Sequence, residues 1–132
     1  TTAAKNGVDV RIITPHIGDK WYAHAVTRAH YNVLVEAGVR VYEYTPGFIH
    51  AKMYVSDDIQ AIVGGANTDY RSMYLNFENC CSFYAGSLVG QVKKDFEDTF
   101  SKSRQVTITD VNKTGFFKRL LQLFLRVLSP MM

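Results

Sequence analysis

Two apolar runs separated by a pair of aspartates occupy residues 48–67, which read FIHAKMYVSDDIQAIVGGAN. The first run, Phe48 to Ser56, and the second, Ile59 to Val63, are rich in β-branched and aromatic residues, the composition typical of strands. The dipeptide Asp57-Asp58 between them is typical of a tight turn, because short acidic side chains form turns readily. We therefore expect two consecutive strands joined by this turn.

The residues before this pair predict a strand, a helix and a second strand. Alternating apolar residues at 8–12 indicate a half-buried strand, and Pro15 is expected to stop it. Apolar residues recur at roughly helical spacing from about Lys20 to Glu36, and Gly38 stands where a left-handed helix cap belongs. Residues 39–44 are expected to form the second strand. Because a crossover of this kind is right-handed, the two strands should be parallel.

Two more elements are expected after this region. Residues 77–84 read as another strand, and residues 87–102 read as a helix with a stripe of apolar residues spaced by four, namely Leu88, Val92, Phe96 and Phe100. Strands and helices of this kind place the chain in the α/β class with a mixed sheet.

The composition is that of one globular domain with a core. The chain has 132 residues, of which 47% are hydrophobic and 20% charged, and this excludes a disordered tail or a collagen. No apolar run reaches 18 residues without a charge, so no membrane-spanning helix is predicted. The chain begins at Thr1 without Met, and we expect it to be a piece of a longer protein.

The net charge of +3 is concentrated near the end of the chain. Residues 103–132 carry five basic groups against one acidic group, Asp110, whereas the rest of the chain is close to neutral. A nucleic-acid-binding face would spread Lys and Arg over the fold. We therefore expect no nucleic-acid partner.

Residues 113–132 are expected to form a basic amphipathic C-terminal helix, separate from a domain at 1–112. Lys118, Gln122 and Arg126 are spaced by four and form a narrow polar stripe, and large apolar residues occupy the rest. Such a helix resembles one that lies in a membrane interface. The alternative is a helix that packs on the domain or on a missing part of the protein.

The residues suited to chemistry lie in the quoted stretch and just after it. On a strand, His50 and Lys52 would project from the same face. An imidazole can attack phosphorus or move a proton near neutral pH, and a lysine can hold a phosphate oxygen. Gly64-Gly65 at a strand end would offer open backbone N–H groups to an anion, and Asn67 adds an amide donor. The plainer alternative is that His50 and Lys52 are ordinary polar residues on a solvent-facing strand.

The spacing His50-x-Lys52-(x4)-Asp57-(x6)-Gly64-Gly65-x-Asn67 resembles the HKD motif of the phospholipase D superfamily. The resemblance covers nearly the whole chain and is to the C-terminal half of bacterial cardiolipin synthases. It extends to residues 7–15, 42–52, 69–72, 75–78 and 117–121. The implied fold is a phospholipase D-like α-β-α sandwich half-domain.

The resemblance also implies an activity and a role for each motif residue. Family members use two motifs, each giving one His, one Lys and one Asn to a shared site, and they transfer a phosphatidyl group through a phosphohistidine without a metal or other cofactor. The implied substrate is phosphatidylglycerol, and glycerol is released. His50 is expected to be the general acid/base, Glu78 to orient it, and Asp57 to be structural. Lys52, Gly64, Gly65 and Asn67 are expected to bind phosphate, although the family has Ser or Thr where this chain has Gly65.

The partners implied are the missing N-terminal motif half, the phospholipid and the bacterial cell membrane. The isolated chain should be inactive as a monomer and could form a homodimer. Two alternatives remain open at this point. The chain could be a single-motif phosphodiesterase or nuclease that dimerises to complete its site, or a folding unit without catalysis.

Overall fold

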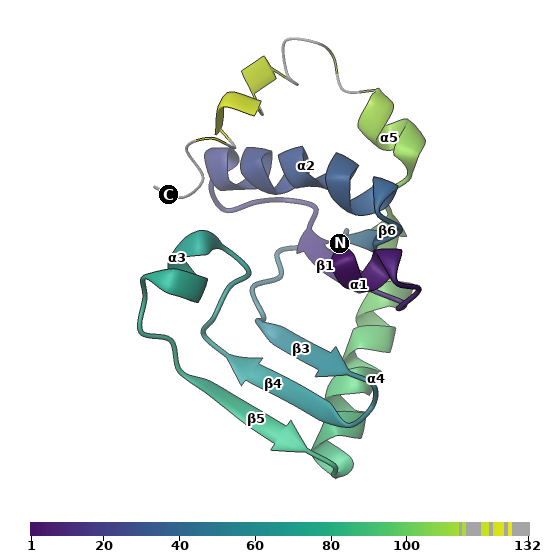
Figure 1. Ribbon diagram of the computed structural model, residues 1–132, viewed down its shortest axis with the longest axis vertical. Helices are drawn as coiled ribbons and strands as arrows, with labels where there is room; N and C mark the ends of the chain where they lie inside the picture. The colour runs from purple at the N-terminus through teal and green to yellow at the C-terminus, as the bar shows by residue number, and fades with distance from the viewer. Residues whose placement is uncertain (114, 116–119, 122, 126, 128–132) are drawn as a thin grey trace. The chain divides into compact units, whose positions relative to one another are not determined.

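The computed structural model describes residues 1–113, 115, 120, 121, 123–125 and 127, and the chain divides into two units (Figure 1). Unit 1 consists of Thr1–Ile49 and Lys102–Met132, and unit 2 of His50–Ser101. Unit 2 is therefore continuous in sequence and inserted into unit 1. All the residues predicted for the site, from His50 to Glu78, lie in unit 2.

Unit 1 is built on a three-stranded mixed sheet of order β1-β2-β6. Its elements are α1 (Thr2–Lys5), β1 (Arg11–Pro15), α2 (Trp21–Glu36), β2 (Arg40–Tyr44), β6 (Ser103–Gln105) and α5 (Ile108–Asn112). β1 pairs with β2 in parallel and β2 with β6 in antiparallel orientation. The predicted α/β class, mixed sheet and parallel strand pair are thus confirmed.

The ends of β1 and α2 follow from local backbone chemistry. Gly38, directly after the helix cap, has φ +89°, the left-handed conformation that glycine adopts without strain. The prediction that Pro15 stops the first strand is confirmed, because Pro15 is the last residue of β1; the strand begins at Arg11 and not, as expected, at residue 8. β1 is an edge strand, where the missing N–H of proline is tolerated.

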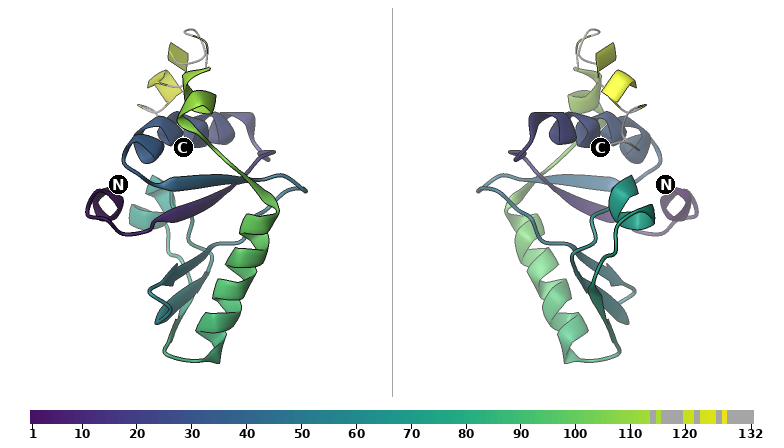
Figure 2. Two further views of the ribbon diagram at one scale, coloured as in Figure 1. Left: turned by 90° about the vertical axis from the view of Figure 1, so that its right-hand side faces the viewer. Right: turned by 90° about the vertical axis from the view of Figure 1, so that its left-hand side faces the viewer.

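The core of unit 1 lies between α2, β2 and the segment around β6. It consists of Tyr31, Val39, Val41 and Val106, and α2 packs against both β2 and α5. Figure 2 shows α2 running across one face of the β1–β2 sheet. Because side chains on a strand alternate between faces, Glu43 follows the fully buried Val41 into this core and is only 1% exposed.

Four side chains from separate segments of unit 1 form what we call the Glu43 cluster: Glu43 itself, His16, Arg28 and Arg104. The Glu43 carboxylate lies 2.9 Å from His16 Nδ1, 3.0 Å from Arg28 Nη2 and 3.3 Å from Arg104 Nη2. Burial alone would raise the pKa of Glu43. The hydrogen bond from His16 and the charge of Arg28, with a further bond from Arg104, outweigh burial and hold that pKa below its ordinary value.

Unit 2 is built on a three-stranded antiparallel sheet of order β3-β4-β5. Its elements are β3 (Met53–Ser56), β4 (Gln60–Gly64), α3 (Tyr70–Tyr74), β5 (Cys80–Tyr84) and α4 (Ser87–Ser101). α4 packs against all three strands and covers one face of the sheet (Figure 2). Val89 of α4 is buried, whereas Leu88, the first residue of the predicted apolar stripe, is half exposed. The sequence did not predict that the strands divide between two sheets.

The turn between β3 and β4 forms as expected. Asp57 and Asp58 have φ values of 51° and 59°, and the N–H of Ile59 donates to the carbonyl of Ser56 at 3.0 Å. Two consecutive left-handed residues match the right-handed twist of a two-residue hairpin. The carboxylate of Asp58 also binds Lys93 of α4 at 2.6 Å, so the turn is attached to the helix beside it.

The predicted C-terminal helix is described only in part. Residues 120, 121, 123–125 and 127 are helical; Leu125 is buried, whereas Phe124 and Val127 are exposed. The polar stripe of Lys118, Gln122 and Arg126 lies outside the described residues. Within the part of the chain that is described, no helix has the length and apolar character needed to cross a membrane.

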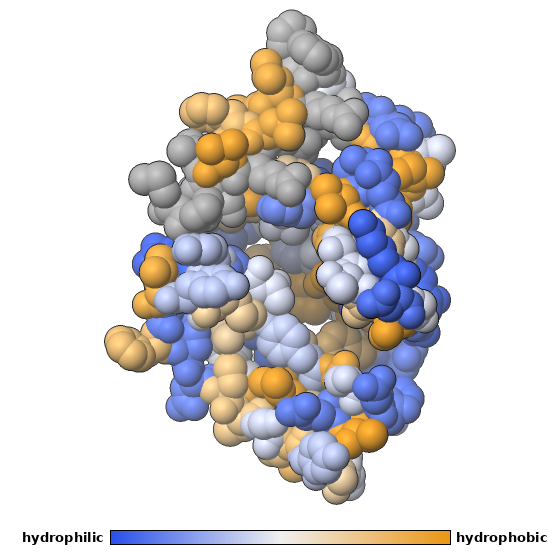
Figure 3. Space-filling model, viewed as in Figure 1, coloured by the Kyte–Doolittle hydropathy of each residue, from blue (hydrophilic) through white to orange (hydrophobic). Residues whose placement is uncertain are grey.

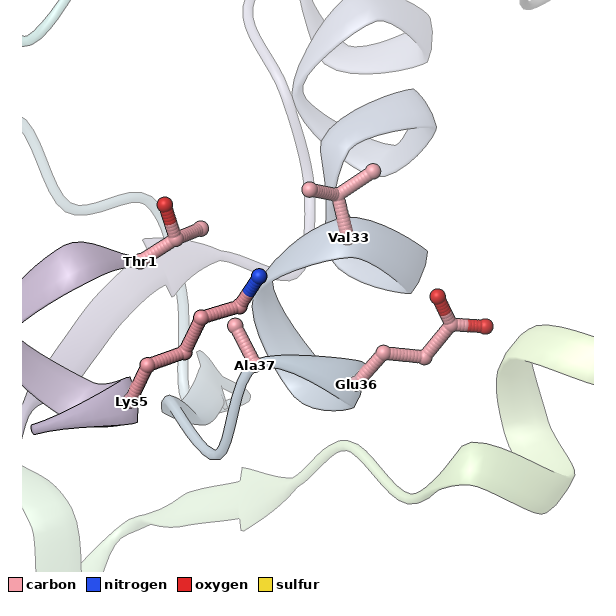
Figure 4. Close-up of a pocket in the computed structure, with 5 residues that line it drawn as sticks. All are labelled: Thr1, Lys5, Val33, Glu36 and Ala37. Atoms are coloured by element: carbon pink, nitrogen blue, oxygen red, sulfur yellow. The ribbon is translucent and has the colours of Figure 1, made fainter. Parts of the chain in front are cut away.

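A shallow pocket in unit 1 lies beside α1 and the end of α2 (Figure 4). It is lined by Thr1, Lys5, Val33, Glu36 and Ala37. None of these residues belongs to the predicted site. The predicted site therefore lies outside this pocket.

Candidate active site

His50 and Lys52 meet directly, although they precede the strand on which they were expected. Lys52 Nζ lies 2.8 Å from His50 Nε2 and also donates to the His50 carbonyl at 2.8 Å. The prediction that the strand begins at Phe48 was wrong, because β3 begins at Met53. Gly64 still donates its N–H to the Lys52 carbonyl, but Gly65 donates to Asn79 on the other side. The pairing of β4 with the chain before β3 therefore ends at Lys52, because the next N–H, that of Gly65, bonds to Asn79 instead.

The contact brings the imidazole and the ammonium group of the motif together. An ammonium group can only donate a hydrogen bond, so Lys52 Nζ is the donor in this contact. An anion that binds Lys52 would compete for the same ammonium protons. This arrangement suits a pair of groups that share a phosphate.

Asp57 lies at the other end of the hairpin from this pair. Met53 is paired with Val63 and Ser56 with Gln60, so the turn is four residues along β3 from Lys52. The Asp57 carboxylate accepts from Ser56 Oγ at 3.1 Å, within the turn. This position agrees with a structural role.

The expectation that Gly64 and Gly65 offer open N–H groups to an anion was wrong. The N–H of Gly64 donates to the Lys52 carbonyl at 3.1 Å, and that of Gly65 donates to the Asn79 carbonyl at 3.0 Å. A Cβ at Gly64 would lie 2.4 Å from the Asn79 carbonyl oxygen and 2.5 Å from Cys80 Sγ. Glycine is thus required at position 64 because the neighbouring backbone approaches closely. Phosphate binding by Lys52 and Asn67 stays a prediction.

Glu78 lies against Gly65. A Cβ at position 65 would stand 2.9 Å from Glu78 Oε2, so the carboxylate occupies the space beside the glycine where the family has a Ser or Thr side chain. Glu78 Oε1 also accepts from Asn76 Nδ2 at 3.4 Å. Glu78 therefore lies beside Gly65, just after the end of β4. The orientation of His50 by Glu78 stays a prediction.

Asn67 is attached to α3. Its Nδ2 donates to Ser72 Oγ at 3.4 Å, and Ser72 is buried. Asp69 caps α3 by accepting from the N–H of Ser72 at 2.7 Å. On the residue before Asn67, the carbonyl of Ala66 accepts from the hydroxyl of Tyr54 at 2.9 Å. The amide of Asn67 is thus held by contacts that begin on β3 and α3.

The surface that follows Asn67 is partly apolar. α3 and the segment leading to β5 expose Tyr70, Met73, Tyr74, Leu75 and Phe77. Figure 3 shows apolar side chains at the edge of the molecule over this part of unit 2. Charged residues of the same segment, Asp69, Arg71 and Glu78, are exposed as well, so apolar and charged side chains alternate on this surface.

Sequence reasoning missed Tyr54 and Ser72, and each had a signal. Tyr54 is two residues after Lys52 and is therefore a near neighbour of the motif in sequence. Ser72 is three residues after Asp69, the spacing between a helix cap and the N–H that it accepts. The Glu43 cluster was also missed. Its signal was a carboxylate two residues after Val41, on the buried face of β2.

Comparison with known proteins shows the family of the chain. Residues 1–100 match the family described as cardiolipin synthase, PLD-like domain. Over 98% of this chain, an uncharacterised protein of Streptococcus mutans is 41% identical, cardiolipin synthase of Alkalihalophilus pseudofirmus 38% and cardiolipin synthase 1 of Bacillus anthracis 36%. The chain spans about a quarter of the length of these relatives, between 26% and 28%. It belongs to the PLD-like domain family of cardiolipin synthases.

Proposed function

We propose that this chain supplies one half of the active site of a phosphatidyltransferase, which makes cardiolipin from two molecules of phosphatidylglycerol. The observation that carries the proposal is the 2.8 Å contact between Lys52 Nζ and His50 Nε2 in a chain of this family. The relatives named cardiolipin synthase support the reaction. These relatives are longer than this chain, which supports a second half of the active site outside it. A phospholipid substrate would place the reaction at the bacterial cell membrane.

In the first step, a histidine of the second half attacks the phosphorus of one phosphatidylglycerol. The bond from phosphorus to the glycerol oxygen breaks, and a phosphohistidine forms. His50 gives a proton to the leaving glycerol oxygen, which avoids the release of an alkoxide. Lys52 and Asn67 hold the non-bridging oxygens, on which negative charge is concentrated during transfer.

In the second step, His50 acts in the reverse direction. It takes the proton from a free hydroxyl of another phosphatidylglycerol, and that oxygen attacks the phosphorus of the phosphohistidine. The phosphorus–nitrogen bond breaks and cardiolipin is released. The cycle needs one histidine as nucleophile and another as acid and base, so a monomer of this chain alone should form no cardiolipin.

The test uses the full polypeptide that contains this chain, reconstituted with phosphatidylglycerol vesicles. His50→Ala and Lys52→Met are expected to abolish cardiolipin formation, measured by mass spectrometry, without changing the circular dichroism spectrum. Lys94→Met, which removes an exposed lysine of α4, is the matched control and should keep full activity. Activity retained in His50→Ala would refute the proposal, and cleavage of DNA without cardiolipin formation would favour the nuclease instead.

A further inference from the structure

The segment Gly64–Asn67 is attached at each of its residues to a different partner within unit 2. Gly64 and Gly65 donate their N–H groups to the carbonyls of Lys52 and Asn79. The carbonyl of Ala66 accepts from Tyr54, and the amide of Asn67 donates to Ser72. The first two attachments use only backbone atoms. The last two depend on the hydroxyl groups of single side chains.

The Tyr54 hydroxyl connects the two phosphate-binding side chains. Tyr54 follows Lys52 by two residues on the chain that enters β3, and its hydroxyl reaches the residue directly before Asn67 at 2.9 Å. The ring is half-buried, and burial raises the pKa of Tyr54 above its ordinary value of 10.0, with Cys80 and Asp69 adding to the rise. The hydroxyl therefore stays protonated and able to donate across the neutral range.

The Ser72 hydroxyl acts on Asn67 separately from the helix cap. The cap uses the backbone N–H of Ser72, which donates to Asp69 Oδ1 at 2.7 Å, whereas Asn67 uses the side-chain oxygen. Ser72 is 7% exposed, so little water is available to replace it as an acceptor. With one N–H of Asn67 directed at Ser72, rotation of the amide is restricted. Replacing Ser72 by Ala removes this acceptor and leaves the cap in place.

We infer that Tyr54 and Ser72 are positioning residues that fix the amide of Asn67 relative to Lys52, so that both side chains bind one phosphate. This inference rests on the proposed function. The two hydroxyls do not touch the phosphate. They act through Asn67, one on the backbone before it and the other on its side chain.

The test is a pair of double-mutant cycles on cardiolipin formation by the full polypeptide in phosphatidylglycerol vesicles. Tyr54→Phe and Ser72→Ala are each expected to lower kcat about 3- to 10-fold, the loss typical of one hydrogen bond. In an Asn67→Ala background, neither substitution should lower kcat further, because residues that act through one group are not additive. Tyr31→Phe is the matched control: it removes a buried hydroxyl bonded to Thr14 at 2.7 Å in unit 1 and should leave kcat unchanged.

A second measurement on this 132-residue chain needs no activity. The side-chain amide protons of Asn67, observed by ¹⁵N nuclear magnetic resonance, should exchange with solvent faster in Ser72→Ala than in the wild type. Additive losses of kcat in the Asn67→Ala background, or an exchange rate unchanged by Ser72→Ala, would overturn the inference. A wild-type polypeptide that makes no cardiolipin would refute the proposed function alone, since the exchange measurement would still decide the role of Ser72. If Ser72→Ala does not fold, the cycle with Tyr54→Phe decides.

Discussion

Glu43→Gln is expected to lower the free energy of unfolding of the chain by about 3 kcal/mol. Glutamine has nearly the shape of glutamate, but it carries no charge and turns two N–H donors toward groups that are themselves donors. The Glu43 carboxylate is 1% exposed and serves His16, Arg28 and Arg104 at 2.9, 3.0 and 3.3 Å. The substitution therefore removes the negative charge that faces Arg28 and Arg104, and one of the two acceptor oxygens that the three partners share.

The magnitude follows from how the partners are placed. Breaking a buried ion pair by removing one member costs about 3–5 kcal/mol. The three partner side chains are 30–52% exposed and can turn partly toward water, which favours the lower end of that range. For a chain of this size, 3 kcal/mol corresponds to a fall in Tm of roughly 10 °C.

The assay is urea unfolding at pH 7, followed by far-ultraviolet circular dichroism. Glu36→Gln, which changes an exposed carboxylate at the end of α2, is the control and should stay within about 0.5 kcal/mol of the wild type. Equal stability of the Glu43→Gln and Glu36→Gln chains would refute the reasoning. It would mean that the cluster contributes no more than an ordinary surface pair.

Three further outcomes are expected. The pKa of Glu43 is lowered on folding, so the contribution of Glu43 to stability is full above its ordinary pKa of 4.5. That contribution is lost as pH falls through the lowered value. On acidification, the urea midpoint should therefore fall further in the wild type than in Glu43→Gln. Gly64→Ala should destabilise unit 2 by about 2 kcal/mol or more in urea unfolding, because its Cβ would strike the Asn79 carbonyl, whereas Gly90→Ala, with open space on α4, should stabilise it by up to about 1 kcal/mol. Deleting residues 113–132 should abolish co-sedimentation with phosphatidylglycerol vesicles, and high salt should weaken binding of the intact chain only partly; equal binding by both chains would make the tail a packing element.

Local patterns predicted the elements of this fold well. The helix of 20–36, its glycine cap and the aspartate turn each depend on neighbours in sequence, and each is present. The antiparallel edge of the first sheet depends on β6, a strand of three residues that pairs with β2 across 59 or more residues. A strand this short has no recognisable periodicity, so no local pattern could have placed it.

The site was predicted in part, for a similar reason. The contact of His50 with Lys52 depends only on these two residues and their spacing. It is present although both residues precede β3. Whether the N–H groups of Gly64 and Gly65 are open to an anion depends on their neighbours in space. These neighbours are the carbonyls of Lys52 and Asn79, which accept the two hydrogen bonds. Spacing within one segment cannot reveal such partners. The resemblance to a family identified the residues and left their neighbours unknown.

The insertion of unit 2 into unit 1 has a consequence for the order in which the chain folds. β2 can pair with β6 only after Tyr44 and Ser103 meet, and the Thr45 hydroxyl then donates to the Lys102 carbonyl at 3.0 Å. Closing a flexible loop of that length costs conformational entropy, which a preformed body between the two ends reduces. During synthesis, residues 50–101 emerge as a continuous segment before β6 exists. Unit 2 is therefore expected to form before unit 1 is complete, because unit 1, which carries Glu43, is completed only when Arg104 has been made.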